Sequence, residues 1–410
     1  MWKSIFDRML TRLIQTGQLQ VTYPDGRTET YGTQAEPSVA VRITDDAALK
    51  ALCLNPELGL GESYMEGTLQ IEGDDVEGLL RVLLRNRRHD DLPLWARLYS
   101  GVRYGAQSWL RRNTPGLARK NVAHHYDLSD DLYRLFLDQD MQYSCAYFAD
   151  PAMSLEDAQQ AKKAHIAAKL RIEPGMRVLD IGCGWGGMAL TLARDHGAQV
   201  TGVTLSENQL ATARRRAAEA GLERSTEFRL QDYRDISETF DRIVSVGMLE
   251  HVGVPFYGTY FGQVANLLDR DGLALIHTIG GLAPPGAQAE WITKYIFPGG
   301  YIPTLSQLTP AVERSGLWSL DIEVMRLHYA MTLRHWLERF DANLDTVRQS
   351  YDDRFIRMWR YYLIACFMTF EEEYQAVFQF QLGHRLDAAP LTRHYLHSGR
   401  AAADFHEAAE

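Results

Sequence analysis

The chain is poor in cysteine, has no long apolar run and carries no excess of positive charge. Its four cysteines form no C-x-x-C pair, which suits a reducing compartment and argues against a structural zinc site. No run is long enough to span a bilayer and no secretory signal pattern is present, so we expect a cytoplasmic protein. The net charge of -10 argues against a general polyanion binder, and we expect no nucleic-acid partner.

The positive charge that is present is concentrated in one stretch. Residues 80–120 hold ten Lys or Arg against two Asp. Aromatic residues alternate there with arginines, a composition that suits a peripheral contact with anionic lipid at about 1 kcal/mol per basic residue. A nucleic-acid patch and a plain solvated helix remain open alternatives. The residues concerned are Trp95, Arg97, Tyr99, Arg103, Tyr104, Trp109, Arg111 and Arg112.

The first part of the chain predicts a small α+β domain over residues 1–86. Residues 1–15 carry an apolar stripe at three-and-four spacing, which predicts a helix packed on its own domain or lying on lipid. Pro24-Asp25-Gly26 lies between two strand-like runs and predicts a hairpin. We expect a further strand, a short helix and then a loop, over residues 39–43, 47–54 and 59–67. Residues 87–120 would form a basic aromatic linker.

From Met176 strand and helix patterns alternate, which predicts a doubly wound α/β sheet within a domain over residues 121–397. The expected strands are 177–181, 199–203, one near 227, 242–246 and 273–279. The expected helices are 121–137, 156–170, 189–194, 206–220, 330–340 and 357–380. We expect a loop at 291–301 and a flexible tail over 398–410.

The strongest local signal is the strand Arg177–Ile181 followed by a glycine-rich turn. Glycines let a backbone approach a ligand closely, and the next helix offers free N–H groups at its start. The glycines fit the dinucleotide pattern G-x-G-x-x-G, but the next strand ends in Thr204-Leu205-Ser206 where a nicotinamide site requires an acid. Asp180, just before the glycines, is typical of loops that hold the aminoacyl end of S-adenosylmethionine. A tight turn without ligand is the bland alternative.

Seven motifs occur in a fixed order between residues 121 and 381. They are Tyr143-Ser144-Cys145, 180–186, 204–209, Asp232-Tyr233-Arg234, 245–251, 275–279 and 295–300. Together they resemble the cyclopropane-fatty-acid synthase family of S-adenosylmethionine-dependent methyltransferases, and residues 59–67 fit the family's N-terminal part. The resemblance implies a Rossmann-like class I methyltransferase fold with a helical cap, beside the N-terminal α+β domain. It implies methyl transfer to the cis double bond of a phospholipid acyl chain through a carbocation.

The same resemblance places the cofactor. Tyr143 and Ser144 would lie over the methionine end, and Gly247 on the sulfonium side. Tyr233 and Arg234 would flank the adenine. The loop beneath the cofactor would be Asp180, Ile181, Gly182, Cys183, Gly184, Trp185 and Gly186, with Cys183 and Trp185 shaping it. The ribose would be held by Thr204, Leu205, Ser206 and Gln209, with Gln209 replacing the usual acid.

The resemblance also implies a bound bicarbonate, which would take a proton from the transferred methyl. Its shell would be Cys145, Glu250, His277, the backbone of Ile279, and Tyr329. Imidazole and phenol groups can donate to an oxyanion, whereas a carboxylate beside an anion is unfavourable unless a proton is shared. Cys366 matches a further active-site candidate of the family, yet no step requires a thiolate, and a buried structural cysteine is its alternative. We expect no metal.

Three functions therefore compete. The first is cyclopropane formation, and the second is a related lipid methylation that ends at a methyl-branched or unsaturated chain. The third is a lipid-binding protein with an inactive methyltransferase core, which complete cofactor motifs disfavour. The implied partner is an unsaturated phospholipid at the inner face of the membrane, met by a cytoplasmic, peripheral enzyme. The oligomeric state stays open, a homodimer included.

Overall fold

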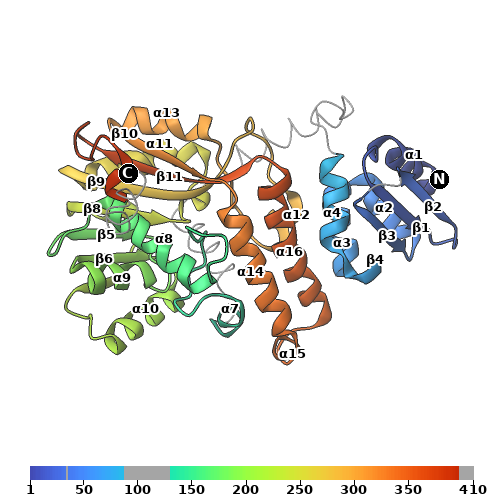
Figure 1. Cartoon of the computed structure of the whole chain (residues 1–410), viewed down its shortest axis with the longest axis horizontal. Coiled ribbons are helices and arrows are strands. Elements are labelled where there is room, and N and C mark those ends of the chain that lie inside the picture. Colours follow the sequence, from blue (N-terminus) through green and yellow to red (C-terminus); the bar gives the residue numbers. More distant parts are fainter. Residues whose placement is uncertain (34–35, 87–129, 397–410) are drawn as a thin grey trace, which may run out of the picture.

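The computed structural model describes residues 1–33, 36–86 and 130–396, and it contains two β-sheets in separate parts of the molecule (Figure 1). The basic aromatic stretch over 87–120 and the tail after residue 397 lie outside the described residues. The proposed boundaries at 86, 120 and 397 therefore stay predictions.

The N-terminal part packs helices on a four-stranded sheet in the order β2-β1-β3-β4. Phe6 and Leu10 on the apolar stripe of α1 are buried in the core of this part, so the stripe packs on its own domain. The predicted hairpin forms as the antiparallel pair β1 and β2. The elements are α1 (Trp2–Leu13), β1 (Gln18–Thr22), β2 (Thr28–Gly32), β3 (Ser38–Ile43), α2 (Asp46–Leu54), α3 (Pro56–Met65), β4 (Leu69–Ile71), η1 (Glu72–Asp74) and α4 (Val76–Arg85).

The predicted loop at 59–67 is wrong, because residues up to Met65 belong to helix α3. Asn55 caps this helix by accepting from the Leu58 amide, and Pro56 occupies its first turn. Gly59 and Gly61 serve close packing, whereas Gly67 lies in the turn after the helix with a left-handed φ of 75°. A Cβ at Gly61 would lie 2.4 Å from Cδ1 of the Trp291 indole in the other part of the molecule.

We expect Gly61→Ala to lower the free energy of unfolding by about 1–3 kcal/mol, because the added methyl has no room beside Trp291. Urea denaturation followed by tryptophan fluorescence measures this. Gly258→Ala is the matched control, since Gly258 is also helical and a Cβ added there would meet nothing within 4 Å. A loss no larger than that of the control would contradict the prediction.

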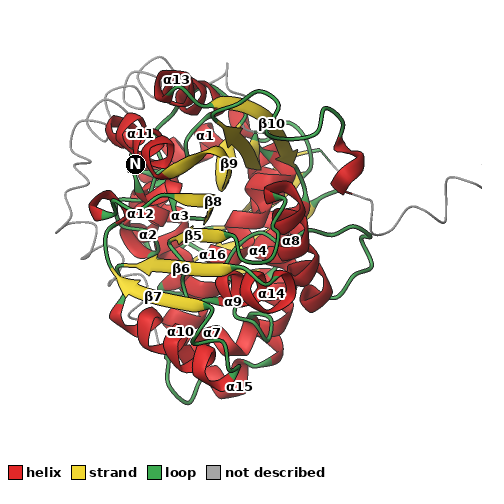
Figure 2. Ribbon diagram, turned by 90° about the vertical axis from the view of Figure 1, so that its left-hand side faces the viewer, coloured by secondary structure: helices red, strands yellow, loops and turns green. Residues whose placement is uncertain are grey.

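The larger part is a seven-stranded sheet in the order β10-β11-β9-β8-β5-β6-β7. Strands β5 to β9 are parallel, and β11 pairs antiparallel with β9 and β10. Figure 2 shows these strands as a central layer with helices on both sides. The strands and the helices between them are β5 (Arg177–Ile181), α9 (Gly187–His196), β6 (Gln199–Thr204), α10 (Glu207–Glu219), β7 (Thr226–Leu230), η2 (Tyr233–Asp235), β8 (Phe240–Val246), η3 (Leu249–His251), η4 (Val254–Phe256), α11 (Tyr257–Leu267), β9 (Leu268–Gly281), α13 (Leu305–Ser315), β10 (Trp318–Met325) and β11 (Gln375–Gly383).

Alternating strand residues assign the helices to the two faces of the sheet. Leu179 packs in the same core as α11 and α13, whereas Val178 packs with α8 (Leu155–Leu170), α9 and α10. Both faces are therefore covered, as the apolar runs of the strands predict.

The C-terminal region differs from the prediction in several places. The helix expected over 357–380 ends at Glu372 as α16 (Asp353–Glu372), and 375–383 form the strand β11 inside the sheet. This strand is buried on both faces, and such a run has no periodicity that separates it from a helix. The loop expected at 291–301 begins as helix α12 (Glu290–Tyr295). The elements α13 and β10 were not predicted.

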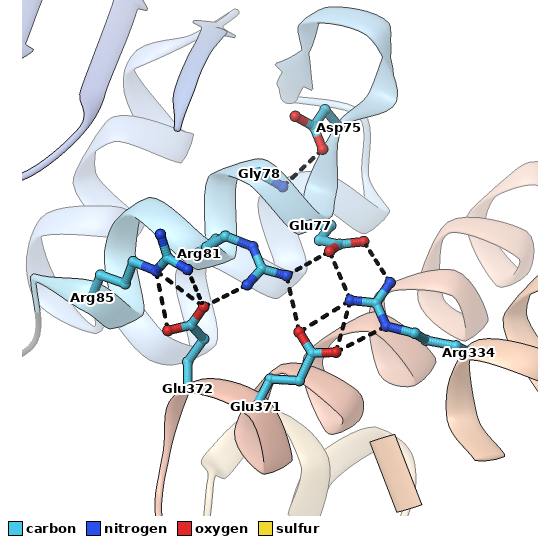
Figure 3. A network of polar contacts seen from close by, with 8 residues as sticks. All are labelled: Asp75, Glu77, Gly78, Arg81, Arg85, Arg334, Glu371 and Glu372. Carbon is cyan, nitrogen blue, oxygen red and sulfur yellow. Dashed lines mark hydrogen bonds and ion pairs between the residues drawn. The ribbon is translucent and has the colours of Figure 1, made fainter. Parts of the chain in front are cut away.

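Helices α14 (His328–Ala342) and α16 pack together beside the sheet and carry the N-terminal part on their other side (Figure 1). Val76 and Leu80 of α4 share one apolar core with both helices. Around this core lies an ion-pair network that joins α4 to α14 and α16 (Figure 3). The helices α7 (Asp130–Phe136) and α15 (Leu344–Val347) and the turn η5 (Arg393–Leu396) complete the described chain.

Candidate active site

A cavity of ≈ 170 Å³ opens where the parallel strands β5, β6, β7 and β8 end. In open α/β sheets ligands bind at this carboxyl edge. The lining residues are Met141, Gln142, Tyr143, Ser144, Asp180, Ile181, Gly182, Cys183, Gly184, Trp185, Gly187, Met188, Val203, Thr204, Leu205, Gln209, Gln231, Asp232, Tyr233, Arg234, Val246, Gly247, Met248, His251, Pro298 and Gly299. Fourteen of the sixteen residues that the sequence assigned to the cofactor are among them.

Gly186 and Ser206 are the two that do not line the cavity, and each has a local structural task. Gly186 begins helix α9 with a left-handed φ of 84°, and its Cβ would meet the Phe228 ring at 2.9 Å. Ser206 caps α10 by accepting from the Gln209 amide. Their predicted contact with the cofactor has no support from the cavity.

Asp180 is the buried acid at the end of β5. Burial raises the pKa of this carboxyl to about 7. Its Oδ2 has no hydrogen-bond partner among the described residues, and the side chain lines the cavity. An orphaned buried carboxylate oxygen at this position suits a cationic ligand group such as an α-ammonium.

The side of the cavity expected to hold the ribose and adenine is also formed. Thr204 donates from Oγ1 to Oε1 of Gln209 at 2.9 Å, which fixes the amide that stands where an acid is usual. The Arg234 guanidinium lies over the Tyr233 ring at 5.7 Å and is paired with Asp232 at 2.6 Å. Arg234 is therefore held in place before any ligand arrives.

The segment 141–144 also lines the cavity. The Tyr143 hydroxyl lies 2.7 Å from that of Tyr362, and its ring stacks on Trp336 at 5.1 Å. Tyr362 in turn contacts Phe297 edge-on at 5.9 Å. This aromatic group continues into the apolar core that α14 and α16 form beside the cavity.

Glu250 and Ile279 are brought together beside the cavity. Oε1 of Glu250 accepts from the Ile279 amide at 2.6 Å, while Oε2 is buried without a partner among the described residues. Burial raises the pKa of Glu250 to about 7. The Ile279 amide expected to bind an anion is thus already engaged by Glu250, so this part of the prediction changes: the amide orients the carboxyl.

His277 lies two residues before Ile279 on the same buried strand. Its pKa is held well below the usual value, first by burial and then by nearby Lys162, so the ring is neutral. Nε2 of Gln379 donates to Nδ1 of His277 at 3.1 Å, which leaves the ring proton on Nε2. The ring can therefore act as a hydrogen-bond donor.

Tyr329 and the two candidate cysteines share the apolar core next to the cavity. Tyr329 contacts Trp336 edge-on at 5.8 Å, and Cys145 is buried. Burial raises the pKa of the Cys366 thiol to about 12 and that of Cys145 further. Both remain thiols at neutral pH, which agrees with a reaction that needs no thiolate.

Several lining residues were not assigned a role from the sequence. His251 directly follows Glu250, and Asp232, Pro298 and Gly299 lie in quoted motifs, so a signal was available. Val246 and Met248 also lie in one of those motifs, 245–251, and the others are Met141, Gln142, Gly187, Met188, Val203 and Gln231. Burial lowers the pKa of His251 to about 4, so it too is neutral in the cavity.

Comparison with known proteins gives the family. The model of the mycolic acid cyclopropane synthetase family matches residues 115–380. The chain belongs to this family. A second model, for a domain of unknown function, matches residues 3–89.

Individual relatives agree with this membership. The cyclopropane-fatty-acyl-phospholipid synthase of Escherichia coli is 41% identical over 80% of this chain and 83% of its own. The tuberculostearic acid methyltransferase UfaA1 of Mycobacterium tuberculosis is 35% identical over 92% of this chain and 91% of its own. The structure of mycolic acid cyclopropane synthase CmaA1 complexed with SAH and CTAB superposes with a TM-score of 0.61 at 35% identity, over 64% of this chain and 97% of that one.

Family membership makes the chain an S-adenosylmethionine-dependent methyltransferase and confirms the family predicted from its motifs. The predicted Rossmann-like class I fold with an N-terminal α+β part is confirmed as well. Among the described residues, no three or more His, Cys, Asp or Glu side chains are grouped to hold a metal ion. No helix in the described ranges is both long and apolar enough to cross a bilayer.

Proposed function

We propose that this enzyme transfers a methyl group from S-adenosylmethionine to the cis double bond of an unsaturated phospholipid acyl chain and closes a cyclopropane ring. The observation that carries the proposal is Glu250, a buried carboxyl beside the cofactor cavity with one oxygen oriented by the Ile279 amide and the other unpartnered within the described chain. Ring closure requires removal of one proton, and this group can hold or orient the base that takes it.

The lining of the cavity fits the cofactor. Asp180 suits the ammonium of its methionine end, and the fixed pair Thr204 and Gln209 suits the ribose hydroxyls. When bound, S-adenosylmethionine supplies an electrophilic methyl group. Tyr143 and Ser144 complete the lining of the site.

The aromatic core beside the cavity suits the acyl chain. An alkene that accepts a methyl becomes a carbocation, which water would quench, so the site must exclude water. The Tyr143 ring stacks on Trp336 and its hydroxyl meets that of Tyr362, and aromatic faces stabilise positive charge. Tyr329 and Phe297 extend the same group.

We further propose that bicarbonate is held next to Glu250. Its shell would be Cys145, Glu250, His277 and Tyr329, with Ile279 orienting the carboxyl. Bound bicarbonate supplies the base for ring closure. The raised pKa of Glu250 supports the fit, because a protonated carboxyl can donate to an anion, as can the neutral His277 ring. Cys366 takes no chemical part in this proposal.

The substrate would be met at the inner face of the membrane by a cytoplasmic, peripherally bound enzyme. The Escherichia coli relative, named for an acyl-phospholipid substrate, supports the lipid class. UfaA1, named as a tuberculostearic acid methyltransferase, supports the alternative product, a methyl-branched chain without a ring.

One experiment separates these functions. The protein is incubated with methyl-labelled S-adenosylmethionine and vesicles of a monounsaturated phospholipid, and the fatty acids are analysed by mass spectrometry and gas chromatography. We expect a labelled product with a saturated ring. A labelled branched or unsaturated product would establish the alternative, and cofactor binding with no labelled lipid would overturn both.

A further inference from the structure

A fully buried lysine contacts two residues of the cavity lining, Gln142 and Ser144. Lys162 on helix α8 has no exposed surface, and its Nζ donates to Oε1 of Gln142 at 2.6 Å and to Oγ of Ser144 at 2.8 Å. Both of these hydrogen-bond acceptors are uncharged. Among the described residues, no carboxylate lies within ion-pair distance of the Lys162 ammonium. A buried charge without a paired carboxylate is unfavourable for stability, which calls for another reason for its presence.

The surrounding contacts fix both acceptors. Nε2 of Gln142 donates to Oδ2 of Asp140 at 2.9 Å, and Asp140 is itself paired with Lys163 at 2.5 Å. The amide of Gln142 thus donates to the Asp140 carboxylate and accepts from the Lys162 ammonium, so it can adopt one orientation only. One turn before Lys162, Gln159 donates to the backbone carbonyl of Ser144 at 2.9 Å. Helix α8 therefore supports the segment 142–144 from below.

The ammonium also decides which way the Ser144 hydroxyl is polarised. An ammonium has donors and no acceptor, so Oγ of Ser144 must accept from Lys162. The hydroxyl proton of Ser144 is then available for an acceptor in the cavity, which Ser144 lines. Burial lowers the pKa of Lys162 to about 8, which leaves the amine protonated as an ammonium at neutral pH.

We propose that Lys162 is a positioning residue that makes Ser144 a hydrogen-bond donor toward the carboxylate at the methionine end of the cofactor. This inference rests on the proposed placement of the cofactor. Under this inference Lys162, which does not line the cavity, contributes to recognition of the amino-acid part of the ligand. The nucleoside part is recognised by residues at the ends of β6 and β7. It also gives a reason for the buried charge, because only the Ser144 hydroxyl would separate the ammonium from the anionic end of the cofactor.

The test compares two ligands by isothermal titration calorimetry. S-adenosylhomocysteine carries the amino-acid end, and 5′-methylthioadenosine lacks it. We expect Lys162→Met to weaken binding of S-adenosylhomocysteine about 10- to 100-fold, the effect of losing a hydrogen bond to a charged group, and that of 5′-methylthioadenosine less than about twofold. Ser144→Ala should produce the same selective loss, and combining it with Lys162→Met should add little.

Lys169→Met is the matched control. Lys169 is equally buried on the same helix, but it pairs with Glu323 at 2.5 Å instead of supporting the cavity. It should lower stability without changing the ratio of the two affinities. Equal weakening of both ligands by Lys162→Met would overturn the inference. If that variant does not fold, an unchanged ratio in Ser144→Ala would overturn it instead. Wild-type protein that binds neither ligand would refute the proposed cofactor site itself.

Discussion

Replacing Glu250 by Gln is expected to reduce cyclopropane formation about 10²- to 10⁴-fold while making the ligand-free protein more stable at pH 8. The loss of turnover follows from removing the group that we propose to hold or orient the base. The amide can still accept from the Ile279 N–H through its oxygen, so the fold around the site is kept. Cofactor binding should therefore change little.

The gain in stability follows from the pKa of Glu250. Burial raises it from 4.5 to about 7, so the folded state holds this proton more tightly than the unfolded state between those values. The contribution of Glu250 to the free energy of unfolding is then full below pH 4.5 and decreases as the pH rises to about 7. A shift of this size corresponds to about 3 kcal/mol, and a Gln side chain does not undergo this loss.

Urea denaturation of both proteins at pH 5 and pH 8 measures the effect. The difference in stability should favour Glu250→Gln more at pH 8 than at pH 5. Glu313→Gln serves as control, because Glu313 is an exposed carboxyl on α13. If the difference in unfolding free energy between Glu250→Gln and the wild-type protein does not grow with pH, Glu250 is not held as a buried acid. Unchanged turnover of the variant would remove Glu250 from the proposed site.

The parts of this molecule that were predicted from sequence are those determined by neighbours along the chain. The strand ending at Ile181, its acid and its glycines lie within ten residues, and the structure places them around one cavity. The motifs identified the family because they occur in a fixed order, which no single glycine loop would have done.

The parts that were missed depend on residues distant in sequence. Gly61 was interpreted as a loop residue, but it is a glycine because Trp291 packs against it. The first part of β11 was interpreted as helix because burial on both faces removes the alternation that marks a strand. Lys162 carried no signal at all, since a lysine on an amphipathic helix is ordinarily solvated and only the fold places it beneath Ser144.

Neutralising the ion-pair network between the two parts of the molecule is expected to separate their unfolding. Arg81 of α4 bridges Glu371 and Glu372 of α16 at 3.0 and 2.5 Å, and Arg334 of α14 bridges Glu371 and Glu77 at 2.8 and 3.0 Å (Figure 3). Each arginine lies between carboxylates that would otherwise face one another. We expect Arg81→Met to lower the free energy of unfolding by about 2 kcal/mol, because three partly buried carboxylates each lose one of two arginine partners.

The double variant Arg81→Met, Arg334→Met tests the coupling. We expect its scanning calorimetry to show two transitions, because α4 then contacts α14 and α16 only through the apolar core around Val76 and Leu80 and the Arg85–Glu372 pair, among the described residues. The wild-type protein should unfold in one transition. Added salt should reduce the difference between the thermograms of the wild-type protein and the double variant, because salt screens the ion pairs of the network. Arg385→Met, which breaks an exposed pair with Asp387 away from this contact, should leave the wild-type transition as it is. A double variant that still unfolds in a single transition at the wild-type midpoint would show that the Arg81 and Arg334 pairs do not couple the two parts.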